Sequence, residues 1–433
     1  MGTVAVSQGI THPSEEAVRR LMASGAALMS NAMLTSVLGV VFWVVAARMV
    51  PTDRLGRDTA AVTLMLAIAA ASDLNMNVTL PRLLPQLGRR SRQFTYGSYA
   101  ACCATALVAA AAVALVTSHT EGSMAFLGTF PVVVLFAAAC VGWGIFALQD
   151  SVMTAFGAAR WVPVENALFG VLKIVLLVVL AKADYEHPVL LAWVVGMAVL
   201  LPPVNLFIAR LLRTTAHLRP SLTLRGKEAT RSALVRFLAW DYGGSLAQQA
   251  AVAALPLVVV GMVGQRSNAY FSIAMSCALA LDGLFIAVCA PLAVEAAAEP
   301  DTASQLARRA MFRFGAILVP MLVLVTVLAP LLLRPFGPEY VEHATTSLRL
   351  MTLAAIPQGL VHLWGVLLRH EGATARIAIV QALNTIMLVA LLLFLVPRYW
   401  LAGAGLAWLV THLVTAVFLL PTLYRRLRLE THA

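Results

Sequence analysis

Charged side chains are scarce in this sequence of 433 residues: they make up 12% of it, against 61% hydrophobic residues, and the mean hydropathy is +0.86. Apolar windows of about 20 residues recur along the whole chain, so no stretch is left for a soluble domain. The runs are too long and too uniformly apolar for barrel strands, whereas helices satisfy their own backbone groups in lipid. These features predict an all-α polytopic membrane protein.

Motifs of enzymes and of ATP-driven pumps are also missing. No GxxxxGK[ST] sequence occurs, so energy for transport would come from an ion gradient, the membrane potential or the substrate gradient. The predicted external loops are short, the first running from about Arg48 to Arg57, and they leave little room for catalytic groups. We therefore expect a protein that is not an enzyme, with no catalytic residues and no cofactor.

Cysteine is rare and is not arranged for a metal or redox site. There is no CxxC spacing, and all five cysteines fall inside apolar stretches, where we interpret them as packing residues: Cys102, Cys103, Cys140, Cys277 and Cys289. We thus expect no metal site. The first twenty residues are polar and have no hydrophobic signal-peptide region, so insertion is expected to depend on the first span itself.

The formal net charge of +11 comes from arginines and lysines in short clusters between apolar runs. This distribution favours a role in membrane topology over nucleic-acid binding. The densest cluster runs from Arg210 to Arg231, and a segment this basic cannot lie in hydrocarbon. We predict a first lobe of residues 1–212, a basic cytoplasmic linker of residues 213–228 and a second lobe of residues 229–433.

Twelve hydrophobic spans are predicted, at about residues 24–47, 58–81, 94–117, 124–148, 160–181, 188–209, 234–261, 267–294, 312–333, 346–368, 375–396 and 402–423. With the amino terminus inside, the inner loops carry 21 arginines and lysines and the outer loops carry 8. Such an excess is typical of cytoplasmic loops. We expect a bacterial plasma membrane protein with both termini in the cytoplasm.

The two halves of the chain resemble one another. Residues 47–54 (ARMVPTDR) have a partner in residues 260–267 (VGMVGQRS), and residues 156–160 have one in residues 371–376. The offsets, 213 and 215 residues, are nearly equal over a hundred residues. Six spans per half return the chain to the same side, so we predict two six-helix lobes related by a pseudo-two-fold axis along the membrane normal, with substrate between them.

Several short motifs carry a resemblance to a known family. They are residues 46–51 (AARMVP) followed by Gly56, residues 80–85 (LPRLLP), residues 336–340 (FGPEY) and residues 403–405 (GAG). Over nearly its full length the chain resembles the polysaccharide (O-antigen/exopolysaccharide) flippases of the multidrug/oligosaccharidyl-lipid/polysaccharide exporter superfamily. The resemblance implies a twelve-helix, two-lobed fold that turns lipid-linked oligosaccharides from the inner to the outer leaflet.

One subgroup of that superfamily fits poorly. Members that flip the peptidoglycan precursor typically carry two further helices and a set of cavity arginines near the start of the first helix. This sequence has twelve predicted spans and no arginine between Arg20 and Arg48. Binding residues of that subgroup therefore have no counterparts to which they can be assigned.

Lys173 is the first candidate for a substrate contact. It lies thirteen residues past Arg160, about 20 Å at 1.5 Å per residue, and is too deep in its span to reach either surface. Ionisable groups at such depth are expected to face protein or water. Lys173 is predicted either to attract a pyrophosphate-linked glycan in the central cavity or to pair with a buried acid.

Asp73 and Asp282 are candidates for ion coupling. Each is followed by a proline at similar spacing, Pro81 and Pro291, so the two acids occupy nearly equivalent places in the two lobes. A carrier coupled to H+ or Na+ needs buried carboxylates whose occupancy differs between conformations. The alternative is that both acids form hydrogen bonds between helices.

Further polar residues mark the helices that begin each lobe and the ends of spans. Asp241 and Gln248 share one helix face, and Asn31 makes the first span polar. These residues are expected to face a cavity or to pack against a polar neighbour. Arg48 and Arg82, at span ends, are expected to reach lipid head groups or to grip a substrate phosphate.

These observations predict a transporter that flips lipid-linked oligosaccharide precursors by alternating access. The expected partners are a lipid-linked glycan, membrane lipids and a coupling H+ or Na+. One alternative is a multidrug or cation extruder of the same superfamily, whose cavity would be apolar with isolated acids. Another is a membrane component of a polysaccharide assembly complex that does not itself transport.

Overall fold

The computed structural model describes residues 34–119, 122, 124–215, 231–280, 320–370 and 373–429. Within these residues the chain is helical and forms no strand. The first half contains the helix Leu34–Met49 and then α2 (Thr52–Ser72), α3 (Met76–Leu83), α4 (Ser91–Ser118), α5 (Val132–Ala155), α6 (Val162–Lys182) and α7 (Pro188–Thr215). The second half contains α8 (Arg231–Val263), a helix at residues 265–280, the helix Pro320–Leu333, α11 (Pro338–His370) and α12 (Thr374–Leu429).

Seven of the described helices are long and apolar enough to cross a membrane. They are α2, α4, α5, α6 together with the short turn before it, α7, α8 and α12. Many outward apolar side chains are exposed, as at Val108 (71%) and Phe418 (79%), which suits helices surrounded by lipid. The long apolar segments therefore form helices whose outer faces can contact lipid and need not be buried against other helices.

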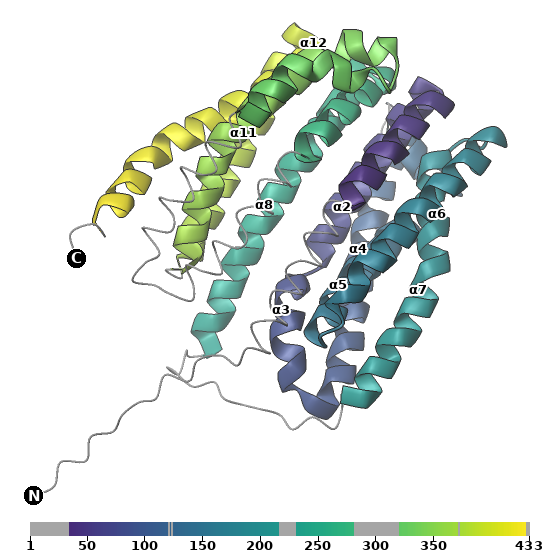
Figure 1. Cartoon of the computed structure of the whole chain (residues 1–433), viewed down its shortest axis with the longest axis vertical. Helices are drawn as coiled ribbons and strands as arrows, with labels where there is room; N and C mark the ends of the chain where they lie inside the picture. Colours follow the sequence, from purple (N-terminus) through teal and green to yellow (C-terminus); the bar gives the residue numbers. More distant parts are fainter. Residues whose placement is uncertain are drawn as a thin grey trace, which may run out of the picture.

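The helices form two groups (Figure 1). Helices α2 to α7 pack together in one group, and α8, α11 and α12 pack together in the other, while α2 lies along α8 where the groups meet. α12 reverses direction at Trp400, whose φ of 53° and ψ of −134° are not helical, so its two halves correspond to the two last predicted spans. The boundary between lobes falls after α7, and the predicted linker lies mainly in residues outside the described ranges.

The internal repeat is visible in the backbone hydrogen bonds. The amide of Leu55 donates to Pro51 and that of Asn268 donates to Gly264, which is an offset of 213 residues in both donor and acceptor. The amide of Ala158 donates to Met153, and 215 residues later the amide of Ala373 donates to Leu368. Each bond closes the same turn in its own lobe, so both offsets predicted from sequence have a structural basis.

Several predicted span limits were wrong. The span at 346–368 belongs to α11, which begins at Pro338. The span at 58–81 is two helices, because Leu74 and Asn75 adopt left-handed conformations (φ of 51° and 61°) and separate α2 from α3. Its true start is Thr52. The span at 124–148 begins only at Val132, since residues 125–128 form a separate short helical turn whose Leu127 is fully buried.

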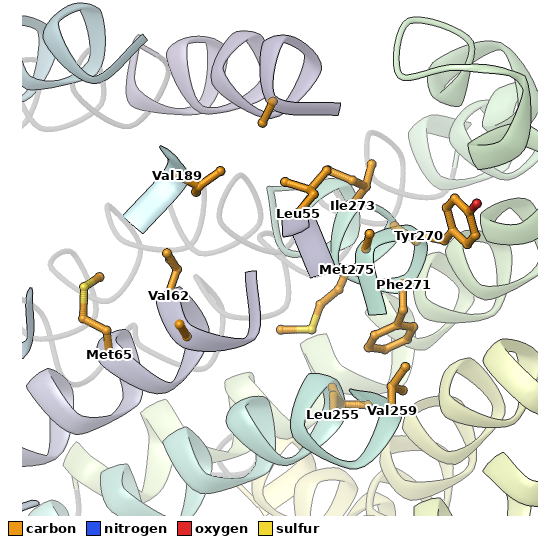
Figure 2. Packing of buried hydrophobic residues seen from close by; sticks show 14 of the residues in the cluster. Leu55, Val62, Met65, Val189, Leu255, Val259, Tyr270, Phe271, Ile273 and Met275 are labelled. Carbon is orange, nitrogen blue, oxygen red and sulfur yellow. The ribbon is translucent and has the colours of Figure 1, made fainter. Parts of the chain in front are cut away.

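The main hydrophobic core continues across both groups of helices. Figure 2 shows Leu55 of α2 pointing toward Ile273 of the helix 265–280, and Phe271 of that helix pointing toward Leu255 and Val259 of α8. Leu55, Phe271 and Ile273 are fully buried. Apolar packing therefore joins the two lobes near the start of α2 and supports the contacts described next.

Candidate functional site

The lobes are held together at one end by backbone packing and hydrogen bonds. We call this the end contact; its residues are Arg48, Gly56 and Thr59 of the first lobe and Gln265, Asn268, Arg334 and Pro335 of the second. The fully buried Asn268 donates from Nδ2 to the Gly56 carbonyl (2.9 Å) and to the Thr59 hydroxyl (3.3 Å). A Cβ on Gly56 would overlap the Gln265 carbonyl oxygen, so the two backbones touch here.

Arg48 takes part in the end contact rather than lying free at a span end. Its Nε donates to the carbonyl of Pro335 (2.6 Å) and its Nη2 to that of Arg334 (3.2 Å). A guanidinium can serve two carbonyls at once because its donors form a rigid fork. The sequence did not indicate this link between lobes. A grip on a substrate phosphate stays a prediction, and it would require these bonds to be released.

A second contact lies at the break between α2 and α3. We call it the break contact: Asn75 donates from Nδ2 to Oδ2 of Asp241 (3.3 Å), and the Tyr242 hydroxyl donates to the Ala71 carbonyl. Ala71 lies fifteen residues beyond Gly56, about 22 Å along α2. The polar face predicted for the first helix of the second lobe therefore meets the first lobe through Asp241.

Asp73 lies two residues before Asn75 and is only 8% exposed. Its Oδ2 accepts a hydrogen bond from the amide of Asn77 (3.3 Å), while Oδ1 has no partner among the described residues. The carboxylate thus helps to start α3 after the break, since capping an exposed helix amide is a common use of Asp. A free buried oxygen next to the lobe boundary also fits the predicted ion-coupling role.

A groove of about 260 Å³ lies between the lobes. Its lining residues are Ser36, Gly39, Val40 and Trp43 of the first helix, Ile273, Ser276, Cys277, Leu279 and Ala280 of the helix 265–280, and Phe336. None of these described lining residues is charged. A mainly apolar groove at the lobe interface suits the apolar part of a cargo.

A polar recess inside the second lobe shares the lining residue Leu279 with this groove. Its polar lining residues are Gln248, Gln358, His362, Gln381, Asn384 and His412, with Trp408 beside them. The recess has a volume of about 50 Å³, enough for several water molecules but not for a sugar ring. Gln248 therefore faces a cavity, as one of the two predictions for it stated, but the cavity lies within one lobe.

Lys173 is enclosed by aromatic rings inside the first lobe. Its Nζ lies 4.2 Å from the ring centre of Trp193, 4.7 Å from that of Phe42 and 5.2 Å from that of Phe169. The residue is 9% exposed, and no acid pairs with it in the described part of the chain. Cation–π attraction of about 2 kcal/mol or more for a desolvated cation stabilises this arrangement.

Lys173 is not among the described lining residues of the groove, and within the described part of the chain no hydrogen bond or ion pair joins it to Asp73 or Asp241. Contact with a substrate phosphate would require the rings to open and stays a prediction. Asn31 and Asp282 lie outside the described residues, and for Arg82 only the backbone, in α3, is described. The predicted symmetry of Asp73 with Asp282 is therefore untested.

One structural site was not predicted from the sequence. Asp58, fully buried in α2, accepts hydrogen bonds from Nδ1 of His187 (2.8 Å) and from the amides of Val189 (2.9 Å) and Leu190 (3.4 Å). It therefore fixes α2 to the start of α7. The available signal was a histidine directly before the proline that begins α7, together with an acid in the first turns of α2.

The geometry matches known transporter structures. A multidrug resistance MATE family transporter of the MOP superfamily in an inward-facing conformation aligns with a TM-score of 0.59 at 16% identity, over 95% of this chain and 96% of that one. A MOP superfamily transporter from Pyrococcus furiosus, described as having a binding pocket of reverse polarity, aligns at 0.60 and 15% identity, over 95% and 96%. The MATE multidrug transporter DinF-BH aligns at 0.66 and 14% identity, over 96% and 97%.

The chain has the fold of the MATE transporters. The prediction of an all-α membrane protein with about twelve helices in two lobes is confirmed. No family model matches the sequence, and no curated protein matches it either. At identities of 14 to 16% these alignments establish the fold and not the cargo.

Proposed function

We propose that this protein is a membrane transporter that moves an amphiphilic lipid-linked oligosaccharide across the bilayer by alternating access. The carrying observation is the groove between the lobes, whose described lining residues are uncharged, together with the recess that shares Leu279 with it and is lined by amides and imidazoles. An apolar groove fits a lipid chain, and neutral hydrogen-bonding groups fit sugar hydroxyls. In this conformation the recess admits only small groups, so it must widen to accept a sugar ring.

Alternating access requires lobe contacts that can be exchanged. The end contact joins the lobes on one side of the groove, and with the predicted topology this is the outer side. We infer that residues 1–212 and 229–433 rock about the groove, and that the end contact opens to release cargo outside. Asp73 is the proposed coupling group in the first lobe, since its carboxylate is buried at the lobe boundary with one oxygen unbonded.

The alternative cargo is a hydrophobic drug, because several structural neighbours are described as multidrug transporters. The groove residues Trp43 and Phe336 offer aromatic surface that would suit a planar cation. However, no described acid lines the groove, and an isolated acid would be expected for a cationic cargo. Direct transport assays therefore distinguish a lipid-linked oligosaccharide from a drug as the cargo.

Gly39 allows the groove to be blocked without disturbing the fold. A Cβ added there would meet no atom within 4 Å, and Gly39 lines the groove. Gly97 on α4 is the matched control, because it is equally free of neighbours and does not line the groove. In reconstituted vesicles, Gly39→Phe should abolish flipping of a fluorescent lipid-linked oligosaccharide, while Gly97→Phe should not.

Two outcomes would contradict the proposal. Normal flipping by Gly39→Phe would exclude the groove as the route. Efflux of a cationic dye by the wild-type protein, with no flipping of the labelled lipid and with loss of efflux in Gly39→Phe, would assign the groove to the multidrug function.

For ion coupling, the Asp73→Asn variant should fold normally, and its transport should no longer depend on an imposed H+ or Na+ gradient. Unchanged dependence on the gradient would mean that Asp73 only caps α3.

A further inference from the structure

Three oxygen-bearing side chains meet inside the first lobe, away from the groove. They are Tyr99 of α4, Asp150 near the end of α5 and Glu165 in the first turn of α6. Glu165 is 5% exposed and Tyr99 is 8% exposed. Asp150 lies beside α6, because it accepts a hydrogen bond from Asn166, the residue after Glu165, and Tyr99 packs in the same core cluster as Leu148 and Val162. Both acids also interact electrostatically with Tyr99.

The polar atoms of this cluster lack protein partners. Both carboxylate oxygens of Glu165, Oδ1 of Asp150 and the hydroxyl of Tyr99 are buried and form no hydrogen bond in the described part of the chain. The remaining oxygen of Asp150 accepts a bond from Nδ2 of Asn166 (3.1 Å). Buried polar groups are almost always hydrogen-bonded, and a buried unpaired carboxylate is strongly disfavoured.

Among the described side chains, no positive charge pairs with the two acids. The arginine closest in sequence, Arg160, is exposed, stacks on Trp161 at 5.9 Å and forms no ion pair with them. The contrast with Asp58 is informative, because that acid is more deeply buried yet accepts three hydrogen bonds and faces His187. Asp58 is a completed structural site, whereas the Tyr99 cluster has four buried oxygens without a hydrogen-bond partner among the described residues.

We propose that Tyr99, Asp150 and Glu165 bind a hard cation. The free donors are all oxygens, two carboxylates and a phenol, which is the donor set that Ca2+ and ions of its hardness prefer over soft or nitrogen-liganded metals. A cation of this kind at about 2.3 to 2.6 Å from each oxygen would satisfy the cluster and cross-link α4, α5 and α6. Na+ and Ca2+ share this chemistry, and the experiment distinguishes them.

This site is independent of the cargo proposed above, so its test needs no transport. The full-length protein in detergent is titrated with CaCl2 or NaCl against choline chloride at constant ionic strength, and the melting temperature is followed. A ligand that binds only the folded state raises this temperature in a saturable way. We expect one of the two cations to give a saturable rise of several degrees in the wild-type protein.

The variants assign the effect to the cluster. Glu165→Gln and Asp150→Asn should abolish the rise, and Tyr99→Phe should weaken the apparent affinity about tenfold, the loss of one neutral ligand. Asp53→Asn, which removes an exposed carboxylate on α2, is the control and should behave as the wild type. Equilibrium binding of radioactive calcium or sodium to the same variants gives a second readout that does not depend on unfolding.

Several results would overturn the proposal. One is an equal rise in Glu165→Gln and the wild type. Another is no response to either cation combined with stabilisation at acidic pH, which would show that protons alone occupy the carboxylates. If the acid variants fail to accumulate, Tyr99→Phe is the deciding test, because it keeps the aromatic ring and removes only the hydroxyl. An unchanged affinity for the ion in Tyr99→Phe would show that the ion does not bind at this cluster.

Discussion

The end contact and the break contact join the same two lobes by different means. At the end contact the backbones of Gly56 and Gln265 touch, and the side-chain amide of the fully buried Asn268 donates across the boundary to Gly56 and Thr59. At the break contact the lobes meet through hydrogen bonds from the side chains of Asn75 and Tyr242. The first depends on close packing and the second on polar groups that can find other partners.

This difference bears on how the lobes could move. A contact between closely packed backbones is either formed or broken, because packed interfaces have discrete arrangements. Hydrogen bonds at the break contact can be exchanged for bonds to water as the lobes separate, so each costs little to lose. We therefore expect the end contact to contribute most of the free energy that stabilises this conformation. The break contact should contribute less, because water can replace its hydrogen bonds.

The largest effect is expected for Gly56→Ala. Alanine favours a helix by about 1 kcal/mol over glycine, yet its Cβ would overlap the Gln265 carbonyl oxygen, and overpacking of this kind costs about 3 kcal/mol or more. In a background without native cysteines, spin labels at positions 53 and 342 should move apart in Gly56→Ala. Gly261→Ala on α8, whose Cβ meets nothing within 4 Å, is the control, and unchanged distances in both variants would contradict the close approach.

A smaller loss is expected when the bridging amide is removed. Asn268→Ala deletes the donor to Gly56 and Thr59, and the Gly56 carbonyl keeps its bond from the Thr59 hydroxyl, so the cost is that of two hydrogen bonds at about 0.5 to 1.5 kcal/mol each. The spin-label distances should broaden toward the separated state. Asn205→Ala, which removes an amide bonded only within α7, should leave the distribution unchanged. A narrow, wild-type distribution in Asn268→Ala would show that the Asn268 amide is not needed to hold the end contact.

Local signals in the sequence predicted the helices and the repeat. Long apolar runs fix the spans, and Pro51 and Gly264 end helices at equivalent points because one restricts and the other frees the backbone. The turn at Gly157, with φ of 71°, is likewise a local property of its sequence. Features of this kind repeat at a constant offset and can be read without knowing the fold.

The sites could be predicted only in part, because their partners come from distant segments. Lys173 was identified by its depth, but its three aromatic neighbours belong to the first helix, α6 and α7. The break at residues 73–75 had no glycine or proline to mark it, and its left-handed Leu74 is stabilised by the surrounding fold. Asp73 and Asp241 were predicted separately, and the break brings them to the same boundary through Asn75.

The break contact should yield a modest coupling energy. A double-mutant cycle with Asn75→Ala and Asp241→Ala isolates their shared hydrogen bond, which at 3.3 Å and half-burial should contribute about 0.5 to 1 kcal/mol. Chemical unfolding in detergent, or the spin-label populations, would give the four free energies. A coupling as large as the loss in Gly56→Ala would reverse the proposed ranking of the two contacts.

The smallest effect is expected for an exposed cluster beside the end contact. Hydrogen bonds from the Tyr270 hydroxyl and then from the Arg266 guanidinium hold the pKa of Glu339 below its ordinary value of 4.5. Because the folded pKa is depressed, any stability from this cluster is present above pH 4.5 and is lost as the pH falls through the folded value. These residues join two helices of the second lobe and do not cross to the first.

Between about pH 7 and pH 5 the melting temperatures of the wild type and Glu339→Gln should therefore differ by a constant amount, and the difference should shrink only at more acidic pH. The spin-label distance across the end contact should not respond to Glu339→Gln at any of these values, since solvent-exposed ion pairs contribute little. A change of distance near neutral pH would mean that surface charge, and not backbone packing at Gly56, keeps the lobes together at this end.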